Sequence, residues 1–81
     1  MRLNMDLIRR LLEWCEEHAP GVRAVPPPRI EGYSPDEVAY HVGLCHQAGF
    51  LDVHVYKNPH TYEIFGLTWA GHIKLKKMRS L

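Results

Sequence analysis

The side chains with the greatest chemical range in this 81-residue chain are its six histidines and two cysteines. Cys15 and His18 are three residues apart, and His41 and Cys45 are four apart, so each pair would share one face of a helix. Two such helices packed together would offer zinc the nitrogen and sulfur ligands that it binds tetrahedrally. The spacings match no recognised zinc motif, however, and a cysteine in a helix is more often a small core residue. We therefore expect no bound metal and no cofactor.

The two cysteines also bear on compartment and catalysis. They cannot form a disulfide framework, and both fall in helical patterns with apolar neighbours, so we expect reduced, buried thiols in a cytoplasmic protein. The chain contains no nucleophile elbow, no phosphate-binding glycine loop and no paired zinc-histidine motif. A chain this short also has little capacity to enclose a reaction cleft. The sequence therefore predicts that the protein is not an enzyme.

Length and composition indicate a single globular domain spanning residues 1–81. Hydrophobic residues make up 46% of the chain and charged residues 23%, and these ordinary values argue against a disordered or fibrous protein. Uncharged apolar runs fall far short of the roughly 20 residues of a membrane span, and we expect neither a membrane anchor nor a signal peptide. The formal net charge is only +1, so any attraction to nucleic acid must come from local basic groups.

The first helix is predicted to begin after Asn4, whose side chain can cap it, and to end at Ala19-Pro20-Gly21. Proline cannot continue the hydrogen-bond ladder, and glycine accepts left-handed dihedrals. The charged face is expected to hold pairs four residues apart, Asp6 with Arg10 and Arg9 with Glu13. The opposite face carries residues at helical spacing: Leu7, Ile8, Leu11, Leu12, Trp14, Cys15 and His18.

Residues 20–33 are expected to form an irregular connector, because three successive prolines at 26–28 and Gly32 interrupt any helix longer than about one turn. One short edge strand is predicted at Arg29-Ile30-Glu31, since sheet edges tolerate proline. A proline-rich ligand for a partner is the functional alternative for this segment, although prolines in so small a chain more often stiffen a loop.

A second helix is predicted to begin at Ser34 or Pro35 and to stop at Gly49. A serine hydroxyl caps free N–H groups, and the carboxylates of Asp36 and Glu37 suit the positive end of the helix dipole. The buried stripe is predicted to consist of Val38, His41 or Val42, Cys45 and Ala48. The exposed positions are expected to be Asp36, Glu37, Ala39, Tyr40, Gly43, His46 and Gln47.

The last third of the chain predicts a hairpin followed by a helix. Apolar and polar residues alternate from Leu51 to Tyr56, and a second run from Tyr62 to Leu67 follows a turn at residues 57–60. Thr68 then caps a final helix in which Ile73, Leu75 and Met78 supply apolar contacts and Gly71 weakens the first turn. The predicted fold class is α+β, in the order helix, proline-rich link, helix, hairpin, helix.

Two stretches of the sequence resemble winged helix-turn-helix proteins. Residues Gly32 to Leu51 resemble the turn and third helix of that superfamily, with a capped start, apolar positions at three- and four-residue steps, and an alanine-glycine-hydrophobe ending. Residues Phe65 to Gly71 resemble the aromatic-any-Leu-Thr-any-any-Gly segment that closes the wing. Most of the chain is also similar to a small family of uncharacterised winged-helix proteins from bacteria and phages, through residues 5–9, 31–34, 40–42 and 67–69.

The resemblance implies a winged-helix module, bacterial or phage-encoded, that binds double-stranded DNA as a regulator does. In such modules a helix enters the major groove and the wing touches the backbone or the minor groove. The contacts that it implies here are Ser34, Tyr40, Gly43, His46 and Gln47 from the second helix, Lys57, Asn58 and His60 from the wing, and Lys74 and Lys77 clamping phosphate from the last helix.

Two features depart from the pattern of DNA-binding winged helices. Asp36 and Glu37 at the leading end of the second helix would repel phosphate, and the proline-containing connector stands where the first helix of the motif should lie. The alternative function is therefore protein–protein interaction or homodimerisation without DNA binding. A positive band shared by the wing and the last helix would favour DNA, whereas an acidic second helix with an exposed patch at Tyr40 and Leu44 would favour protein.

Overall fold

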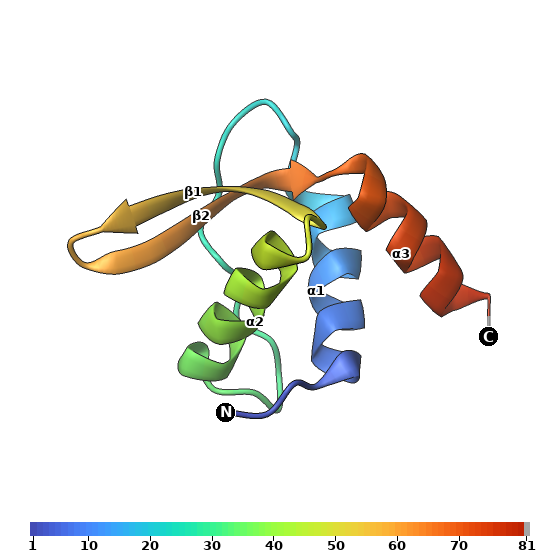
Figure 1. Ribbon diagram of the computed structural model, residues 1–81, viewed down its shortest axis with the longest axis horizontal. Coiled ribbons are helices and arrows are strands. Elements are labelled where there is room, and N and C mark those ends of the chain that lie inside the picture. The colour runs from blue at the N-terminus through green and yellow to red at the C-terminus, as the bar shows by residue number, and fades with distance from the viewer. Residues whose placement is uncertain (81) are drawn as a thin grey trace.

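The computed structural model describes residues 1–80 as three helices and one two-stranded antiparallel sheet (Figure 1). The elements are α1 (Met5–His18), α2 (Pro35–Gln47), β1 (Leu51–Lys57), β2 (His60–Leu67) and α3 (Trp69–Arg79). This order confirms the predicted α+β fold class. Within residues 1–80, every helix falls short of the length and apolar character needed to cross a membrane.

Helix α1 forms the centre of the core. The Asn4 side chain accepts a hydrogen bond from the Leu7 backbone N–H at 3.1 Å, which confirms the predicted cap. The helix ends at His18, as the Ala19-Pro20-Gly21 signal predicts, and Gly21 takes a φ of +85°. Its buried residues are Leu7, Ile8, Leu11, Leu12 and Cys15.

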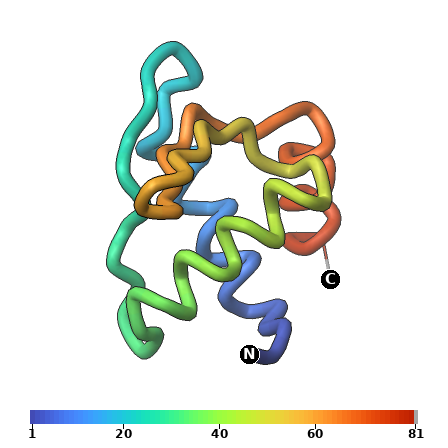
Figure 2. Tube along the Cα trace, turned by 60° about the vertical axis from the view of Figure 1, so that its left-hand side comes forward, coloured from blue at the N-terminus to red at the C-terminus, as the bar shows by residue number. Residues whose placement is uncertain are grey.

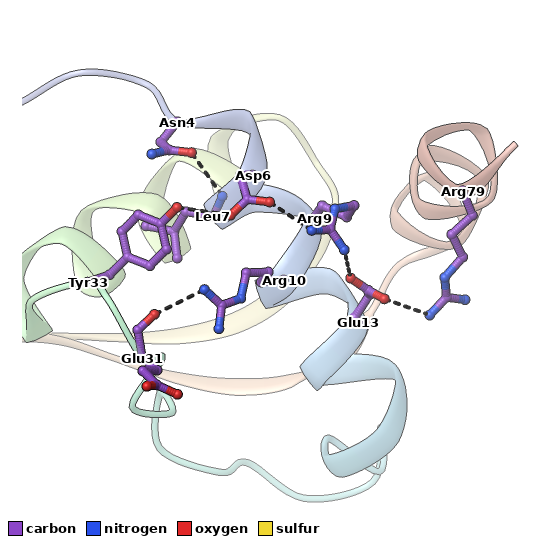
Figure 3. Close-up of polar contacts among 9 residues, drawn as sticks. All are labelled: Asn4, Asp6, Leu7, Arg9, Arg10, Glu13, Glu31, Tyr33 and Arg79. Carbon is purple, nitrogen blue, oxygen red and sulfur yellow. Dashed lines mark hydrogen bonds and ion pairs between the residues drawn. The ribbon is translucent and has the colours of Figure 1, made fainter. Parts of the chain in front are cut away.

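The charged face of α1 differs in part from the prediction (Figure 3). Arg9 pairs with Glu13, as expected, but it also pairs with Asp6, so the predicted Asp6–Arg10 pair is wrong. Arg10 instead donates a hydrogen bond to the Glu31 carbonyl at 3.0 Å, and the Tyr33 hydroxyl donates to Asp6 at 3.0 Å. The hydrogen bonds from Arg9 and then from Tyr33 hold the pKa of Asp6 below its ordinary value. These contacts fix the end of the link against α1, immediately before α2 begins.

The link between α1 and α2 contains no helix and adds one bridge to the sheet. Val25 exchanges two backbone hydrogen bonds with Ile64, at 2.8 and 2.7 Å, and Gly21 N–H donates to the Phe65 carbonyl at 2.7 Å. The edge strand predicted at residues 29–31 is therefore wrong, because pairing stops at Val25 where three prolines without N–H groups follow. Ile30, within the predicted strand, is buried in the core instead.

Helix α2 begins as the sequence predicts. Ser34 accepts from the Glu37 N–H at 3.1 Å, and the Glu37 carboxylate accepts from the Ser34 N–H at 3.0 Å, which completes a capping box. Gly49, with a φ of +81°, follows the helix end. The predicted burial of Val38, His41, Val42 and Cys45 is confirmed, but Ala48 is exposed, since it lies at the C-cap beyond the last turn that faces α1.

His41 ties α2 to the start of α1. The side chain is 1% exposed, its Nε2 accepts from the Asn4 backbone N–H at 2.9 Å, and its Nδ1 lies 2.8 Å from the Glu37 carbonyl. Because the Asn4 N–H only donates and the Glu37 carbonyl only accepts, these partners assign the acceptor role to Nε2 and the donor role to Nδ1. The hydrogen bond from Asn4 therefore joins the N-terminal segment to the buried side of α2.

The hairpin follows α2 directly and projects from the body of the protein (Figure 1). Strand β1 pairs with β2 from Leu51↔Leu67 to Lys57↔His60, with a register shift between Asp52 and Val53. The predicted turn is confirmed, but β2 begins two residues earlier than expected because Lys57 and His60 are themselves paired. Leu51 and Ile64 are buried at the base of the hairpin, which anchors it to the core.

Helix α3 packs closely against the turn between α2 and β1. Thr68 caps α3 by accepting from Gly71 N–H at 3.0 Å, as predicted. A β-carbon at Gly71 would lie 2.0 Å from the Phe50 carbonyl oxygen, so the residue predicted to weaken the helix is the one that allows this approach. Leu75 is buried and Met78 packs on the core, as expected. Ile73 was expected to do the same and is instead 36% exposed, because it faces away from α1.

Figure 2 shows the position of α2 relative to the other elements. Helix α2 crosses in front of α1, with the hairpin above it and α3 beside its C-terminal end. In Figure 1, the tip of the hairpin and α3 extend to opposite sides of α2. One face of α2 is therefore buried on α1, and in Figure 1 α1 lies between α2 and α3.

Candidate nucleic-acid interface and the neighbouring groove

The cysteine and histidine pairs do not form a common ligand set. Cys15 and Cys45 are buried free thiols, and burial raises the pKa of each to about 12, so both are protonated near neutral pH. His18 stacks on Trp14 at the surface, whereas both ring nitrogens of His41 have protein partners. Within residues 1–80, no group of three or more potential ligands is arranged around a metal position.

Most of the residues predicted to contact DNA from the second helix are exposed in the structure. Ser34, Tyr40, His46 and Gln47 are exposed, and Tyr40 retains 43% of its accessible surface. Gly43 is buried, so its expected exposure is wrong. A β-carbon at Gly43 would lie 2.7 Å from the Tyr62 hydroxyl oxygen, which shows that the tyrosine covers this position.

The wing is joined to α2 through Tyr62. Lys57 and His60 are paired in register, and strand alternation places them on the same face as Tyr62. His60 Nε2 lies 3.1 Å from the Tyr62 hydroxyl, and the two rings meet edge to face with centroids 5.2 Å apart. The side of the wing that carries Lys57 and His60 is therefore continuous with α2. Asn58 lies in the exposed turn beyond them.

The sequence-based set of contacts missed Tyr62. Its alternation with Ile64 indicates only that both lie on the inner face of the hairpin. A glycine on the expected outer face of a helix was the available signal, since such a glycine often marks the close approach of another group. Which side chain approaches Gly43 depends on the position of the whole hairpin relative to α2, and the local pattern does not contain that information.

Lys74 and Lys77 belong to α3, and α3 and the tip of the hairpin extend to opposite sides of α2 in Figure 1. Lys74 is half-buried beside Tyr40 and Leu44, and Lys77 is exposed. Neither lysine forms an ion pair within residues 1–80, whereas Arg79 on the same helix pairs with Glu16 at 2.9 Å. Basic side chains therefore stand on both the hairpin, with Lys57, and α3, with Lys74 and Lys77.

The two carboxylates at the start of α2 are not equivalent. Glu37 is half-buried and its carboxylate is hydrogen-bonded to the Ser34 N–H, so its charge is partly compensated. Asp36 is exposed and has no ion-pair partner within the described residues. Asp36 is therefore the more exposed of the two acidic residues at the start of α2.

A groove with mainly apolar walls lies between α2, α3 and the start of α1. It has a volume of about 320 Å³ and adjoins a second hollow of about 410 Å³, with Phe50 and Lys74 lining both. We call the two together the apolar groove. It is lined by Leu3, Met5, Ile8, Tyr40, Leu44, Cys45, Ala48, Phe50, Trp69, Ala70, Ile73, Lys74 and Lys77.

Comparison with known proteins identifies the family. A family model described as "Hypothetical protein (DUF2513)" matches residues 2–81. The chain belongs to the DUF2513 family. The DUF2513 chain is also 30% identical, over 82 residues, to a protein of Haemophilus influenzae (strain ATCC 51907 / DSM 11121 / KW20 / Rd) named "Uncharacterized protein". The alignment covers 99% of this chain and 70% of that relative. No solved structure matches the chain.

Proposed function

We propose that this DUF2513 chain binds duplex DNA, as a regulator-like winged-helix module, with α2 in the major groove and the hairpin as the wing. One observation carries the proposal. The exposed face of α2 carries polar side chains, and the two elements that extend to opposite sides of α2 in Figure 1 both carry lysines: the hairpin has Lys57, and α3 has Lys74 and Lys77.

This arrangement fits the shape and charge of a major groove. The major groove of B-form DNA is about 12 Å wide and admits one helix of about 10–12 Å diameter, with a phosphate backbone on each side. With α2 in the major groove, we expect Lys57 to approach one DNA backbone and the α3 lysines to approach the other. The proposal therefore assigns phosphate contacts to lysines on both the hairpin and α3.

The exposed polar side chains of α2 would contact base edges. Gln47 has both a donor and an acceptor and can bind adenine in a bidentate manner, while His46 and Tyr40 can each donate one hydrogen bond. The Ser34 oxygen accepts the capping bond from Glu37 N–H, which leaves its O–H to donate to a phosphate. His60 and Asn58 would contact the backbone or the minor groove from the wing.

The small number of lysines in the proposed interface limits the expected affinity for DNA. Each lysine that neutralises a phosphate contributes about −0.9 to the slope of log affinity against log salt, so these three give a slope of about −3. We therefore expect weak binding to random sequence, with a dissociation constant in the usual nonspecific range of about 10⁻⁶–10⁻⁴ M. Tighter binding would require base contacts at a specific site.

Lysine substitutions test the proposed docking geometry. Lys57→Gln and Lys74→Gln remove one cation from each side of α2, and each should reduce the salt slope by about one in an anisotropy titration of a labelled duplex. Lys76→Gln is the matched control, because Lys76 is an exposed α3 lysine that does not line the apolar groove. Equal effects of all three substitutions would contradict the docking geometry.

A further inference from the structure

We propose that the apolar groove binds an amphipathic, acidic helix of a partner protein. This interaction goes beyond the proposed DNA binding and does not depend on it. It also specifies the protein-interaction function that the sequence left as an alternative.

Several large apolar side chains that line the groove are exposed to solvent. Trp69 is 82% exposed, Leu3 61%, Met5 45% and Tyr40 43%. Contiguous exposed apolar surface of this kind marks interaction sites rather than ordinary solvent-facing surface. The exposed Val22 on the link lies outside the groove and is a suitable reference for an isolated apolar residue.

The shape of the groove suits a helix. Its two hollows share Phe50 and Lys74, so they lie next to each other. A helix places apolar side chains at three- and four-residue steps on one face, about one turn or 5.4 Å apart. Successive anchors of a docked helix would therefore enter the two adjacent hollows.

Charge identifies the chemistry of the partner. Lys74 and Lys77 are the charged side chains that line the groove, and neither has an ion-pair partner within residues 1–80. Lys74 is half-buried, so a carboxylate brought close to it would act in a partly desolvated environment. A docking helix with glutamate or aspartate beside its apolar face complements these lysines.

The same charges disfavour a second copy of this chain as the occupant. A twofold interface brings the same patch together from both copies, and here that would oppose the two lysine-bearing surfaces. The carboxylates of Glu13 and Glu16, which lie near α3, are already paired with Arg79. Among residues 1–80, the side chains that line the groove therefore include no carboxylate to serve as the acidic partner in a self-complementary interface.

A peptide selection tests this inference. A library of helix-forming peptides of about 16 residues, long enough for marginal helicity in water, would be selected on the immobilised full chain. The enriched peptides should combine apolar residues at helical spacing with acidic flanks. In fluorescence titrations, the best acidic peptide should bind at least about tenfold more tightly than its Glu→Lys counterpart.

Charge reversal in the protein provides the decisive comparison. Lys74→Glu should invert the preference between the acidic and basic peptides, and Lys77→Glu, at a more exposed position, should shift it in the same direction. Val22→Glu should leave both affinities unchanged. Circular dichroism on each variant would establish that it remains folded.

The peptide selection would overturn the inference if it enriched no helical peptide, or if the enriched peptides were neutral or basic. The inference would also fail if both lysine variants kept the wild-type preference for acidic over basic peptides. A dimer of the wild-type chain that Trp69→Ala dissociates would show instead that a second copy occupies the groove. A failure of the chain to bind DNA would be a separate result. If acidic peptides bind the groove and no duplex is bound, the inference stands and only the proposed function is contradicted.

Discussion

The hydroxyl of Tyr62 packs on Gly43 so closely that a β-carbon there would lie 2.7 Å from the hydroxyl oxygen. Tyr62 belongs to β2 and Gly43 to the middle of α2, so the contact joins the two elements of the proposed DNA-binding surface. The same hydroxyl lies 3.1 Å from His60 Nε2. The position of the wing relative to α2 therefore depends on the absence of a side chain at Gly43.

Gly43→Ala should weaken DNA binding without unfolding the protein. The added methyl group displaces the Tyr62 hydroxyl, which is the end of a rotatable side chain, while alanine favours the helix by about 1 kcal/mol relative to glycine. We expect a loss of roughly fivefold in duplex affinity, about 1 kcal/mol, and little change in the urea midpoint.

Tyr62→Phe tests whether that loss arises from the contact itself. The phenylalanine ring removes the oxygen and leaves Cζ as the nearest atom, 3.2 Å from the point that the alanine β-carbon would occupy in the native geometry. The effect of Gly43→Ala on DNA affinity should be clearly smaller in the Tyr62→Phe background. Additive effects of the two substitutions would show that this contact does not couple the wing to α2.

Asp36→Asn should strengthen duplex binding. Asp36 is the exposed carboxylate at the leading end of α2, and the substitution removes its repulsion of phosphate. Because the charge is solvated, we expect a gain of only roughly two- to fivefold at low salt, decreasing as salt screens the interaction. Glu17→Gln removes one exposed carboxylate at the far end of α1 and should have a smaller effect. Equal gains for the two variants would indicate that net charge, rather than the position of α2, controls binding.

His41→Leu should destabilise the fold. The substitution removes the acceptor of the Asn4 N–H and leaves that part-buried donor without its partner, which costs about 1–3 kcal/mol. Urea unfolding followed by circular dichroism measures the change. His72→Leu, at an exposed position on α3, should change stability by less than about 0.5 kcal/mol. A stability of the His41 variant equal to that of wild type would show that the bond to Asn4 contributes nothing.

The stability of the reduced protein should fall as pH rises above about 9. Burial raises the pKa of Cys15 and of Cys45 from the ordinary value of 9.0 to about 12. The unfolded chain therefore loses these two protons first, so the stabilisation is complete below pH 9 and is lost as pH rises toward 12. Each thiol contributes a slope of about 1.4 kcal/mol per pH unit in that range.

Denaturant unfolding between about pH 8 and 10.5, compared with a Cys15→Ala/Cys45→Ala variant, isolates the contribution of the thiols. The variant is expected to be less stable overall because it loses two buried side chains. It should nevertheless show a shallower decline with pH. Parallel declines for the two proteins would mean that the thiols ionise as readily in the folded state as in the unfolded state.

Local signals predicted the elements of this fold. The caps at Asn4, Ser34 and Thr68 each bond to a backbone N–H only three residues away, so the sequence contains both partners. The hairpin is likewise local, since its turn and alternating strands are adjacent in the chain.

The errors arose where distant segments meet. The bridge at Val25 depends on the approach of β2, and the burial of Gly43 depends on Tyr62. Ile73 has the hydrophobicity of a core residue, but the phase of α3 against α1 places it at the surface. The apolar groove could not be predicted in full for the same reason. Its walls come from three helices and the N-terminal segment, although Tyr40 and Leu44 were recognised as part of a candidate patch.

DNA binding by α2 and the wing is the central claim, and a salt series tests it most directly. The wild-type chain would be titrated into a labelled duplex of about 20 base pairs at several salt concentrations between about 50 and 200 mM. We predict saturable binding at the lowest salt, with a log–log slope of about −3. A dissociation constant weaker than about 10⁻⁴ M at about 50 mM salt, or an affinity that does not change with salt, would contradict the claim.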